Sequence, residues 1–446
     1  MPKKSFVWLT MMICMLLPLV AACGSNLSTN TSPGTGPAVS TTLPAGENIY
    51  VLDGYTPQGV ANVDQSIVAF HPGSANATYR LPAGLTSMDH HLLVAAKAQA
   101  NLTTISVIDT QSGVTVRTLT LAGNYSTAGQ DFNNAVLSMD GRWLALRQLD
   151  QSTSRTTIAL VDTQAGKLSK TIHLSGDFDL DTISLDGNAL YLLQRLNDGT
   201  GHYYVQLYTV SENELYQSPI VDKSELNDPN MTGTAVARQV APDASATYTL
   251  YIDTSRNIAF VHILPLDPGF PFARCINLPV GKSSDLLHYY TLTLSSDGAT
   301  LYAANGALGV VSEISLNTGG TSNIYSDQVV ATDHFNPGVT SVTSTGKSRM
   351  LRNGAVLSSD QSTLYFAGLN GIWSVKTADL LHGHGAFKHL LGQQSFTGLA
   401  LSANGKTLYA VDPASGITML AVASGQTQQV LQVPARSPWD IEWIVN

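Results

Sequence analysis

Three aspartates stand at alternate positions in the stretch GDFDLDT, where Asp177, Asp179 and Asp181 alternate with Phe178 and Leu180. Successive side chains of a β-strand point to opposite faces, so this spacing puts the three carboxylates on one face and the two apolar side chains on the other. Carboxylate oxygens are ligands that Ca²⁺ prefers. Three like charges repel one another unless a cation or water separates them. The stretch therefore predicts either a calcium site or a hydrated acidic surface.

The D-x-D-x-D spacing resembles the start of a calcium-binding loop but departs from it afterwards. Thr182 stands where such a loop needs a glycine, and Asn188 stands where it needs a glutamate. We therefore expect no resident cofactor. The alternative is a weak calcium site that carboxylates from neighbouring segments complete.

Motifs of common enzyme classes are missing from the sequence. Neither G-x-S-x-G nor H-E-x-x-H occurs. The tripeptide Gly346-Lys347-Ser348 imitates a phosphate-binding loop, but Ser341 occupies the position of the required first glycine. Three histidines gather in LLHGHGAFKHLL, which glycines mark as a solvated loop rather than a metal site: His382, His384 and His389. The sequence favours a protein that is not an enzyme.

One pattern recurs along most of the chain: an apolar strand, an Asp-Gly or similar turn, and a strand beginning Leu-Tyr. Copies are LSMDGRWLAL at 137–146, ISLDGNALYLL at 183–193, LSSDGATLYAA at 294–304, LSSDQSTLYFA at 357–367 and LSANGKTLYAV at 401–411. Asp-Gly and Asn-Gly pairs accept the positive φ of tight hairpins. A second pattern, IDTQSGVTVRTLTL at 108–121 and VDTQAGKLSKTIHL at 161–174, adds two further strands. Each unit is therefore predicted to be a four-stranded antiparallel meander.

The repeat resembles the YVTN-type β-propeller repeats of bacterial surface and exported proteins over residues 47–446. This resemblance implies an all-β propeller, for which an array of β-sandwiches is the alternative. Eight second strands can be counted, which gives about 50 residues a blade, typical of propellers; seven blades are the alternative. The last strand, around 439–445, has no turn after it, and the first unit lacks a first strand. We expect these two ends to pair and close the ring, which leaves no open sheet edge there.

The tyrosines and the turn aspartates of the repeat are predicted to be structural. Tyr191, Tyr302, Tyr365 and Tyr409 recur at one position of four units, which indicates packing between blades. The aspartates occupy turn positions, where their side chains bond the local backbone.

The first residues have the features of an export signal. Lys3 and Lys4 precede an apolar run at 6–17 that is too short to span a membrane, and Val-Ala-Ala-Cys follows. This arrangement resembles the lipobox of bacterial lipoproteins, which implies a signal peptide at 1–22 and a lipid on Cys23. Residues 23–46 are rich in Ser, Thr, Pro and Gly and are predicted to be a flexible tether. We expect the chain to be lipid-anchored on the extracytoplasmic side of the bacterial membrane or envelope.

Charge and cysteine content limit the partners. The net charge is −9, and becomes −11 once the two signal lysines are removed, which disfavours nucleic acid. Cys275 is the one cysteine left after Cys14 and Cys23, so no intrachain disulfide is expected. We predict a binding or scaffold module that takes a protein, glycan or small-molecule ligand at a propeller face. A hydrolase or lactonase-like enzyme at the channel mouth is the alternative.

Overall fold

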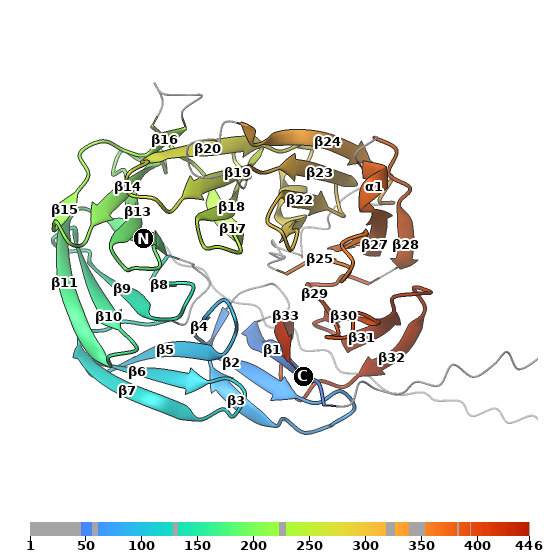
Figure 1. Cartoon of the computed structure of the whole chain (residues 1–446), viewed down its shortest axis with the longest axis horizontal. Helices are drawn as coiled ribbons and strands as arrows, with labels where there is room; N and C mark the ends of the chain where they lie inside the picture. Colours follow the sequence, from blue (N-terminus) through green and yellow to red (C-terminus); the bar gives the residue numbers. More distant parts are fainter. Residues whose placement is uncertain are drawn as a thin grey trace, which may run out of the picture. The chain divides into compact units, whose positions relative to one another are not determined.

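The computed structural model describes residues 46–55, 61–127, 133–222, 229–317, 326–338, 353–380, 383–392 and 394–445. The signal at 1–22, Cys23 and the tether up to residue 45 lie outside the described residues. The compact unit Thr42–Asn446 contains eight sheets arranged in a ring, and each is built on four antiparallel strands (Figure 1). Among the described residues, the helices are too short to cross a bilayer. The predicted eight-bladed propeller is confirmed.

Each sheet is one blade, and the blades are numbered here in ring order. Blade 1 consists of β33 (Pro438–Val445), β1 (Asn48–Tyr55), β2 (Ala61–Phe70) and β3 (Tyr79–Pro82). Blade 2 consists of β4 (Leu85–Thr86), β5 (Leu92–Gln99), β6 (Leu102–Asp109) and β7 (Thr115–Ala122). Blade 3 consists of β8 (Ala135–Leu137), β9 (Trp143–Asp150), β10 (Arg155–Asp162) and β11 (Lys167–Ser175). Blade 4 consists of β12 (Phe178–Ile183), β13 (Ala189–Arg195), β14 (Tyr203–Thr209) and β15 (Glu214–Leu215).

The remaining blades follow the same order. Blade 5 consists of β17 (Thr234–Val240), β18 (Ala246–Asp253), β19 (Ile258–Pro265) and β20 (Phe272–Asn277), with β16 (Val221–Asp222) added at its edge. Blade 6 consists of β21 (Tyr290–Leu294), β22 (Thr300–Asn305), β23 (Val310–Ser315) and β24 (Gln328–His334). Blade 7 consists of β25 (Ala355–Leu357), β26 (Thr363–Gly368), β27 (Gly371–Lys376) and β28 (Lys388–Leu391). Blade 8 consists of β29 (Gly398–Leu401), β30 (Thr407–Asp412), β31 (Gly416–Ala421) and β32 (Thr427–Leu431).

The two ends of the ring pair as the sequence predicts. Strand β33 lies antiparallel to β1, with Ile444 opposite Ile49 and Trp443 opposite Tyr50. First strands such as β4, β8, β25 and β29 lie nearest the centre, and fourth strands such as β7, β11 and β28 lie at the outside (Figure 1).

Blade 5 differs from the predicted four-stranded unit. Strand β16 pairs parallel to β20, which extends this sheet to five strands. Strand β16 ends at Asp222, and β17 begins at Thr234. The described helices are the 3-10 helix η1 (Ser284–Tyr289) and the short α1 (Thr377–Leu380).

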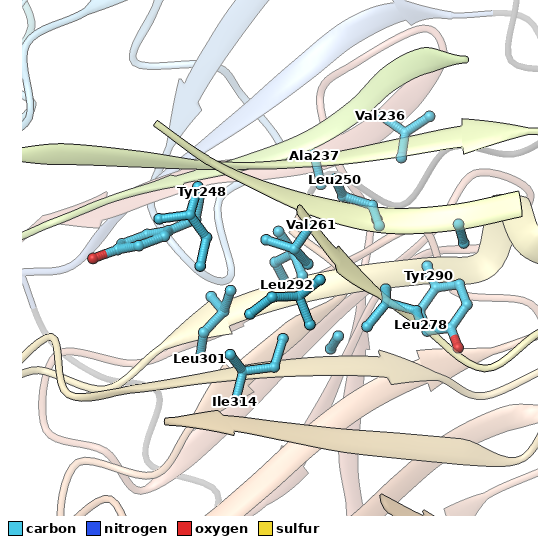
Figure 2. Packing of buried hydrophobic residues seen from close by; sticks show 14 of the residues in the cluster. Val236, Ala237, Tyr248, Leu250, Val261, Leu278, Tyr290, Leu292, Leu301 and Ile314 are labelled. Carbon is cyan, nitrogen blue, oxygen red and sulfur yellow. The ribbon is translucent and has the colours of Figure 1, made fainter. Parts of the chain in front are cut away.

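The hydrophobic core lies between neighbouring blades. Figure 2 shows the cluster between blades 5 and 6, where Leu250 and Val261 face Leu292 and Leu301. The repeat tyrosines belong to equivalent clusters at other junctions, which confirms their predicted packing role: Tyr191, Tyr302, Tyr365 and Tyr409.

Blades 2 to 8 each have a turn between the first and second strands, and six of these seven turns share one construction; blade 5 keeps Asp243 but has Ala241 in place of the serine. In blade 3 the Ser138 hydroxyl donates to Asp140 Oδ1 at 2.5 Å, the same Oδ1 accepts the Arg142 N–H, and the Trp143 N–H donates to Ser138 Oγ at 2.8 Å. The same serine–aspartate arrangement recurs at Ser87, Ser184, Ser295 and Ser358, with Asn404 replacing the aspartate beside Ser402. The predicted turn role of the aspartates is confirmed.

These turns lie side by side around the ring. Gly141 packs against Ser87 of the preceding blade, Gly298 against Pro242, and Gly405 against Ser359. We call the side of the ring that carries them the turn face. Glu47, which lies near the start of the described residues, is on this face, because its carboxylate accepts the N–H of Ala403 in the blade 8 turn at 2.6 Å.

Candidate functional site

A cavity of about 500 Å³ occupies the channel near blades 1 to 5. Its apolar wall includes Ile67, Leu85, Val136 and Leu137, and it reaches the turn face at Met88 and Met139. Polar side chains line the rest, among them Asn134, Arg238, Gln239, Asn353 and Glu442. Polar and apolar groups contribute comparable parts of this wall. Small-molecule sites are usually more apolar, so this cavity is better suited to a polar ligand.

Neighbouring groups hold several of the polar side chains in the cavity wall in place. Asn134 Oδ1 accepts a hydrogen bond from Arg147 at 3.1 Å, and the Gln239 amide donates to the Leu292 carbonyl at 3.2 Å. The Asn353 amide donates to Asp440 at 3.1 Å. Such bonds fix the positions of the groups before any ligand arrives, which lowers the entropic cost of binding.

Asp179 and Asp181 of the predicted acidic surface lie on β12 at the inner edge of blade 4, and Asp177 directly precedes this strand. Phe178 and Leu180 point into the apolar cluster between blades 3 and 4, as the alternation predicts. Asp179 and Asp181 are buried, and only 1% of Asp181 is exposed. A hydrated acidic surface is therefore wrong for these two residues.

Arginines neutralise all three carboxylates. Arg147 of blade 3 lies 2.5 Å from Asp177 and 3.1 Å from Asp179. Arg195 donates from Nε to Asp179 at 2.7 Å, and Arg238 of blade 5 forms an ion pair with Asp181. The result is a chain of ion pairs that joins three consecutive blades at the channel wall.

The three aspartates predicted to bind calcium are all paired with arginines in the structure. A calcium ion at the aspartates would have to displace the arginines, because both are positively charged and would compete for the same carboxylates. Within the described ranges, no three Asp, Glu, His or Cys residues are grouped so that they could hold a metal ion. The residues present do not form a calcium cage, and calcium binding stays a prediction from the sequence.

A row of polar side chains continues outward from Arg238 across blade 5. Arg238 donates to Thr249 Oγ1 at 3.0 Å, Thr249 lies opposite His262, and His262 lies opposite Cys275. Burial lowers the pKa of His262, so this imidazole is neutral, although Asp181 and Asp222 act in the opposite direction. Burial also raises the pKa of Tyr251, whose ring meets His262 edge-on at 6.0 Å. These side chains lie between blades 4 and 5, where they form a row of polar groups beside an apolar cluster.

Two further carboxyl groups are buried at the junction of blades 6 and 7. Glu313 on β23 is 5% exposed and lies opposite Tyr302, and Asp333 lies on the same face of the adjacent strand β24. Burial first, and then the charge of Asp333, raises the pKa of Glu313 to about 7. Among the described residues, Glu313 Oε2 and Asp333 Oδ2 have no hydrogen-bond partner. Glu313 is therefore a buried carboxyl group that holds its proton well above the usual pH range of a glutamate.

Other predicted positions are separated or lie outside the described residues. His384 and His389 are exposed, and His389 stacks on Trp373 at 4.2 Å while its Nε2 lies 2.6 Å from the Asn370 carbonyl. His382 and the Gly346-Lys347-Ser348 tripeptide lie outside the described residues. Cys275 is half-buried and forms no disulfide within the described part of the chain.

Sequence reasoning missed the arginines. Each stands as a lone cation in an otherwise apolar strand, in WLALRQL, LYLLQRL and TAVARQV. With charged residues at only 12% of the chain, this pattern signals that each arginine has a buried partner. The sequence does not say which partner, because the pairs join residues up to 57 positions apart.

Comparison with known proteins finds similarity at the level of the fold. No protein-family model matches the sequence, and neither does any curated protein. Among solved structures, apo AztD from Citrobacter koseri aligns with 10% identity and a TM-score of 0.49 over 90% of this chain and 98% of its own. A periplasmic gluconolactonase from Pseudomonas aeruginosa aligns with 18% identity and a TM-score of 0.39 over 80% of this chain and 98% of its own. Hydrazine synthase from Kuenenia stuttgartiensis aligns with 15% identity and a TM-score of 0.43 over 88% of this chain and 100% of that chain.

Proposed function

We propose that this chain is a membrane-tethered, extracytoplasmic binding module of the bacterial cell envelope, with its ligand site in the channel. The observation that carries the proposal is the cavity of about 500 Å³ in the channel. Its volume lies within the roughly 300–1,000 Å³ of typical ligand pockets. Both apolar and polar walls are available, so a ligand gains from burial and from oriented hydrogen bonds.

The tether supports the location of this module. Cys23 follows Val-Ala-Ala, and residues 24–45 contain no lysine or arginine and many Ser, Thr, Pro and Gly residues. Lipid on Cys23 anchors the chain firmly when two or more acyl chains are attached. A flexible segment of this composition lets the propeller reach ligands near the membrane surface.

Filling the cavity tests whether it binds ligand. Thr86 lines the cavity, so Thr86→Trp occupies part of its volume. Thr118→Trp is the matched control, because Thr118 is exposed on the outer strand β7. The melting temperature of each protein is measured with a panel of monosaccharides, amino acids and dicarboxylic acids. We expect at least one compound to raise the melting temperature of the wild type and of Thr118→Trp but not of Thr86→Trp.

Two results would contradict this proposal. A panel that stabilises none of the three proteins would contradict a small-molecule site in the channel. Turnover of lactone or ester substrates that Asp179→Asn abolishes would replace the binding module with a hydrolase working at the channel.

A further inference from the structure

Three consecutive blades place a large apolar side chain around the channel mouth on the turn face. Met88, Met139 and Leu185 occupy the same position of their turns in blades 2, 3 and 4, whereas Ser296 and Ser359 occupy it in blades 6 and 7. Met88 is 41% exposed and Leu185 is 42% exposed. Contiguous exposed apolar groups mark interaction sites, whereas single exposed apolar residues are common.

Two of these apolar residues, Met88 and Met139, open into the cavity. The Met88 N–H donates to the Met139 carbonyl at 2.8 Å, so the two turns are in contact, and both methionines line the cavity wall. Methionine side chains are flexible and polarisable, and they adapt to apolar groups of different shape. The mouth between Met88 and Met139 is thus suited to accept an apolar side chain from outside.

In six blades an aspartate directly follows the turn position that Met88, Met139 and Leu185 occupy. The exposed carboxylates are Asp89, Asp140, Asp186, Asp243, Asp297 and Asp360. The turn uses the Oδ1 atom of each, as when Asp89 Oδ1 accepts from Ser87 and from the His91 N–H. These bonds lower the pKa of Asp89 and Asp297, so both stay charged at neutral pH.

Positive charge on the same turns is sparse. Arg142 and Lys406 are the permanent cations within the seven turns, and Arg142 already pairs with Asp162 at 3.0 Å. The apolar mouth therefore lies in an acidic surrounding. A docked partner must bring positive charge as well as an apolar group.

We propose that the channel mouth on the turn face docks a cationic protein segment that carries a large apolar side chain. The apolar side chain enters between Met88 and Met139, and flanking lysines or arginines meet the turn aspartates. This proposal rests on the binding function proposed above and names the partner. The chain's own tether does not fit, because residues 24–45 have no cation, and an anionic bilayer is repelled by the same carboxylates.

Binding of short labelled peptides to residues 42–446 tests the docking directly, since these residues form a compact unit by themselves. The probes are fluorescein-labelled KKLFKK, its acidic counterpart EELFEE and its apolar-free counterpart KKSSKK, followed by fluorescence anisotropy at low and high salt. We expect KKLFKK to bind best and to weaken as salt increases, because salt screens exposed charges.

Variants separate the two parts of the surface. Met88→Ser with Met139→Ser removes the apolar contact at the mouth of the cavity. Asp89→Asn with Asp186→Asn removes charge but keeps the turn, since Asn404 already fills this position in blade 8. Asp150→Asn with Asp198→Asn is the matched control, because both cap comparable turns between second and third strands. We expect the first two double variants to bind KKLFKK about three- to tenfold more weakly, with the control unchanged.

Equal binding of KKLFKK and EELFEE, or unchanged binding by both double variants, would overturn the docking proposal. Sedimentation with phosphatidylcholine vesicles in place of peptide binding would overturn it in favour of a lipid surface. None of these results affects the cavity test with Thr86→Trp, so the two proposals fail separately.

Discussion

At the scale of single residues, the ion pairs at the channel wall add little net stability, but each prevents a buried charge from being left without a counter-charge. Asp181 is almost completely buried, and Arg238 donates both to its carboxylate and to its main-chain carbonyl. The attraction within a buried pair roughly offsets the cost of removing both charges from water. Removing one partner leaves the other as an uncompensated charge.

Arg238→Met is therefore expected to destabilise the propeller strongly. Breaking a buried ion pair costs about 3–5 kcal/mol, because the remaining carboxylate has no counter-charge. Urea unfolding followed by circular dichroism measures this loss. The double variant Arg238→Met with Asp181→Asn should recover part of it, and a loss below about 1 kcal/mol for the single variant would show that Asp181 is hydrated.

Glu313 makes the stability of the ring depend on pH. Its pKa is raised to about 7 in the folded protein, above the value of about 4.3 in an unfolded chain. Its contribution is fully present below about pH 4 and is lost as the pH rises to about 7, because the unfolded state releases the proton first.

Glu313→Gln should remove this part of the pH dependence. We expect the variant to be more stable than the wild type by about 3 kcal/mol at pH 8 and similar to it at pH 4. Free energies of unfolding measured across this range give the difference. A constant difference between the two proteins from pH 4 to pH 8 would contradict the assignment.

At the scale of elements, the turn of blade 2 stands out because it lies next to the ring closure. The corresponding turn position has a positive φ in every blade that has this turn, and glycine occupies it at Gly141, Gly187, Gly298 and Gly405. His90 holds the same conformation with φ 56°. Its ring stacks on Trp443 of the closing strand β33, with centroids 5.3 Å apart and planes 3° apart. We infer that this stack compensates for the backbone strain and fastens β33.

Three turns have a non-glycine residue at this position, namely His90, Ala244 and Gln361. Replacing the first two by glycine should separate strain from stacking. Ala244 also has a positive φ of 57° but makes no ring contact in the described structure. Ala244→Gly relieves strain of about 1 kcal/mol, whereas His90→Gly also loses a stack worth about 0.5–1.5 kcal/mol and the burial of the ring. We expect the melting temperature to rise or stay constant for Ala244→Gly and to fall for His90→Gly. A rise for both would show that the stack does not hold the closure.

The elements themselves were largely predictable, and their partners were not. Hairpin turns and alternating strands are local signals, so the repeat predicts the eight blades and the pairing of β33 with β1. The ion pairs between Arg147, Asp179 and Arg195 depend on which strands become neighbours across blades, which no local pattern records. The fifth strand β16 was missed because two residues carry no periodicity.

At the scale of the whole molecule, the proposed location depends on one thiol. Cys23→Ser removes the sulfur that would carry the lipid, so we expect the protein to leave the membrane fraction or to keep its signal peptide. Fractionation of cells, with metabolic labelling by a fatty acid, measures both outcomes. Cys275→Ser is the control, because Cys275 belongs to the propeller. Lipid labelling that persists in Cys23→Ser would contradict the anchor.

The central claim is that the channel mouth, and not the outer rim, receives the ligand in the cell envelope. Photo-crosslinking in cells tests this most directly, with p-benzoyl-phenylalanine placed in the full chain at Met88 or at Val114. Both positions are exposed, but Met88 lines the cavity and Val114, 57% exposed, lies at the outer edge of blade 2. We predict an adduct by mass spectrometry at position 88 and none at position 114. Adducts at position 114 alone, or at neither position, would contradict the account.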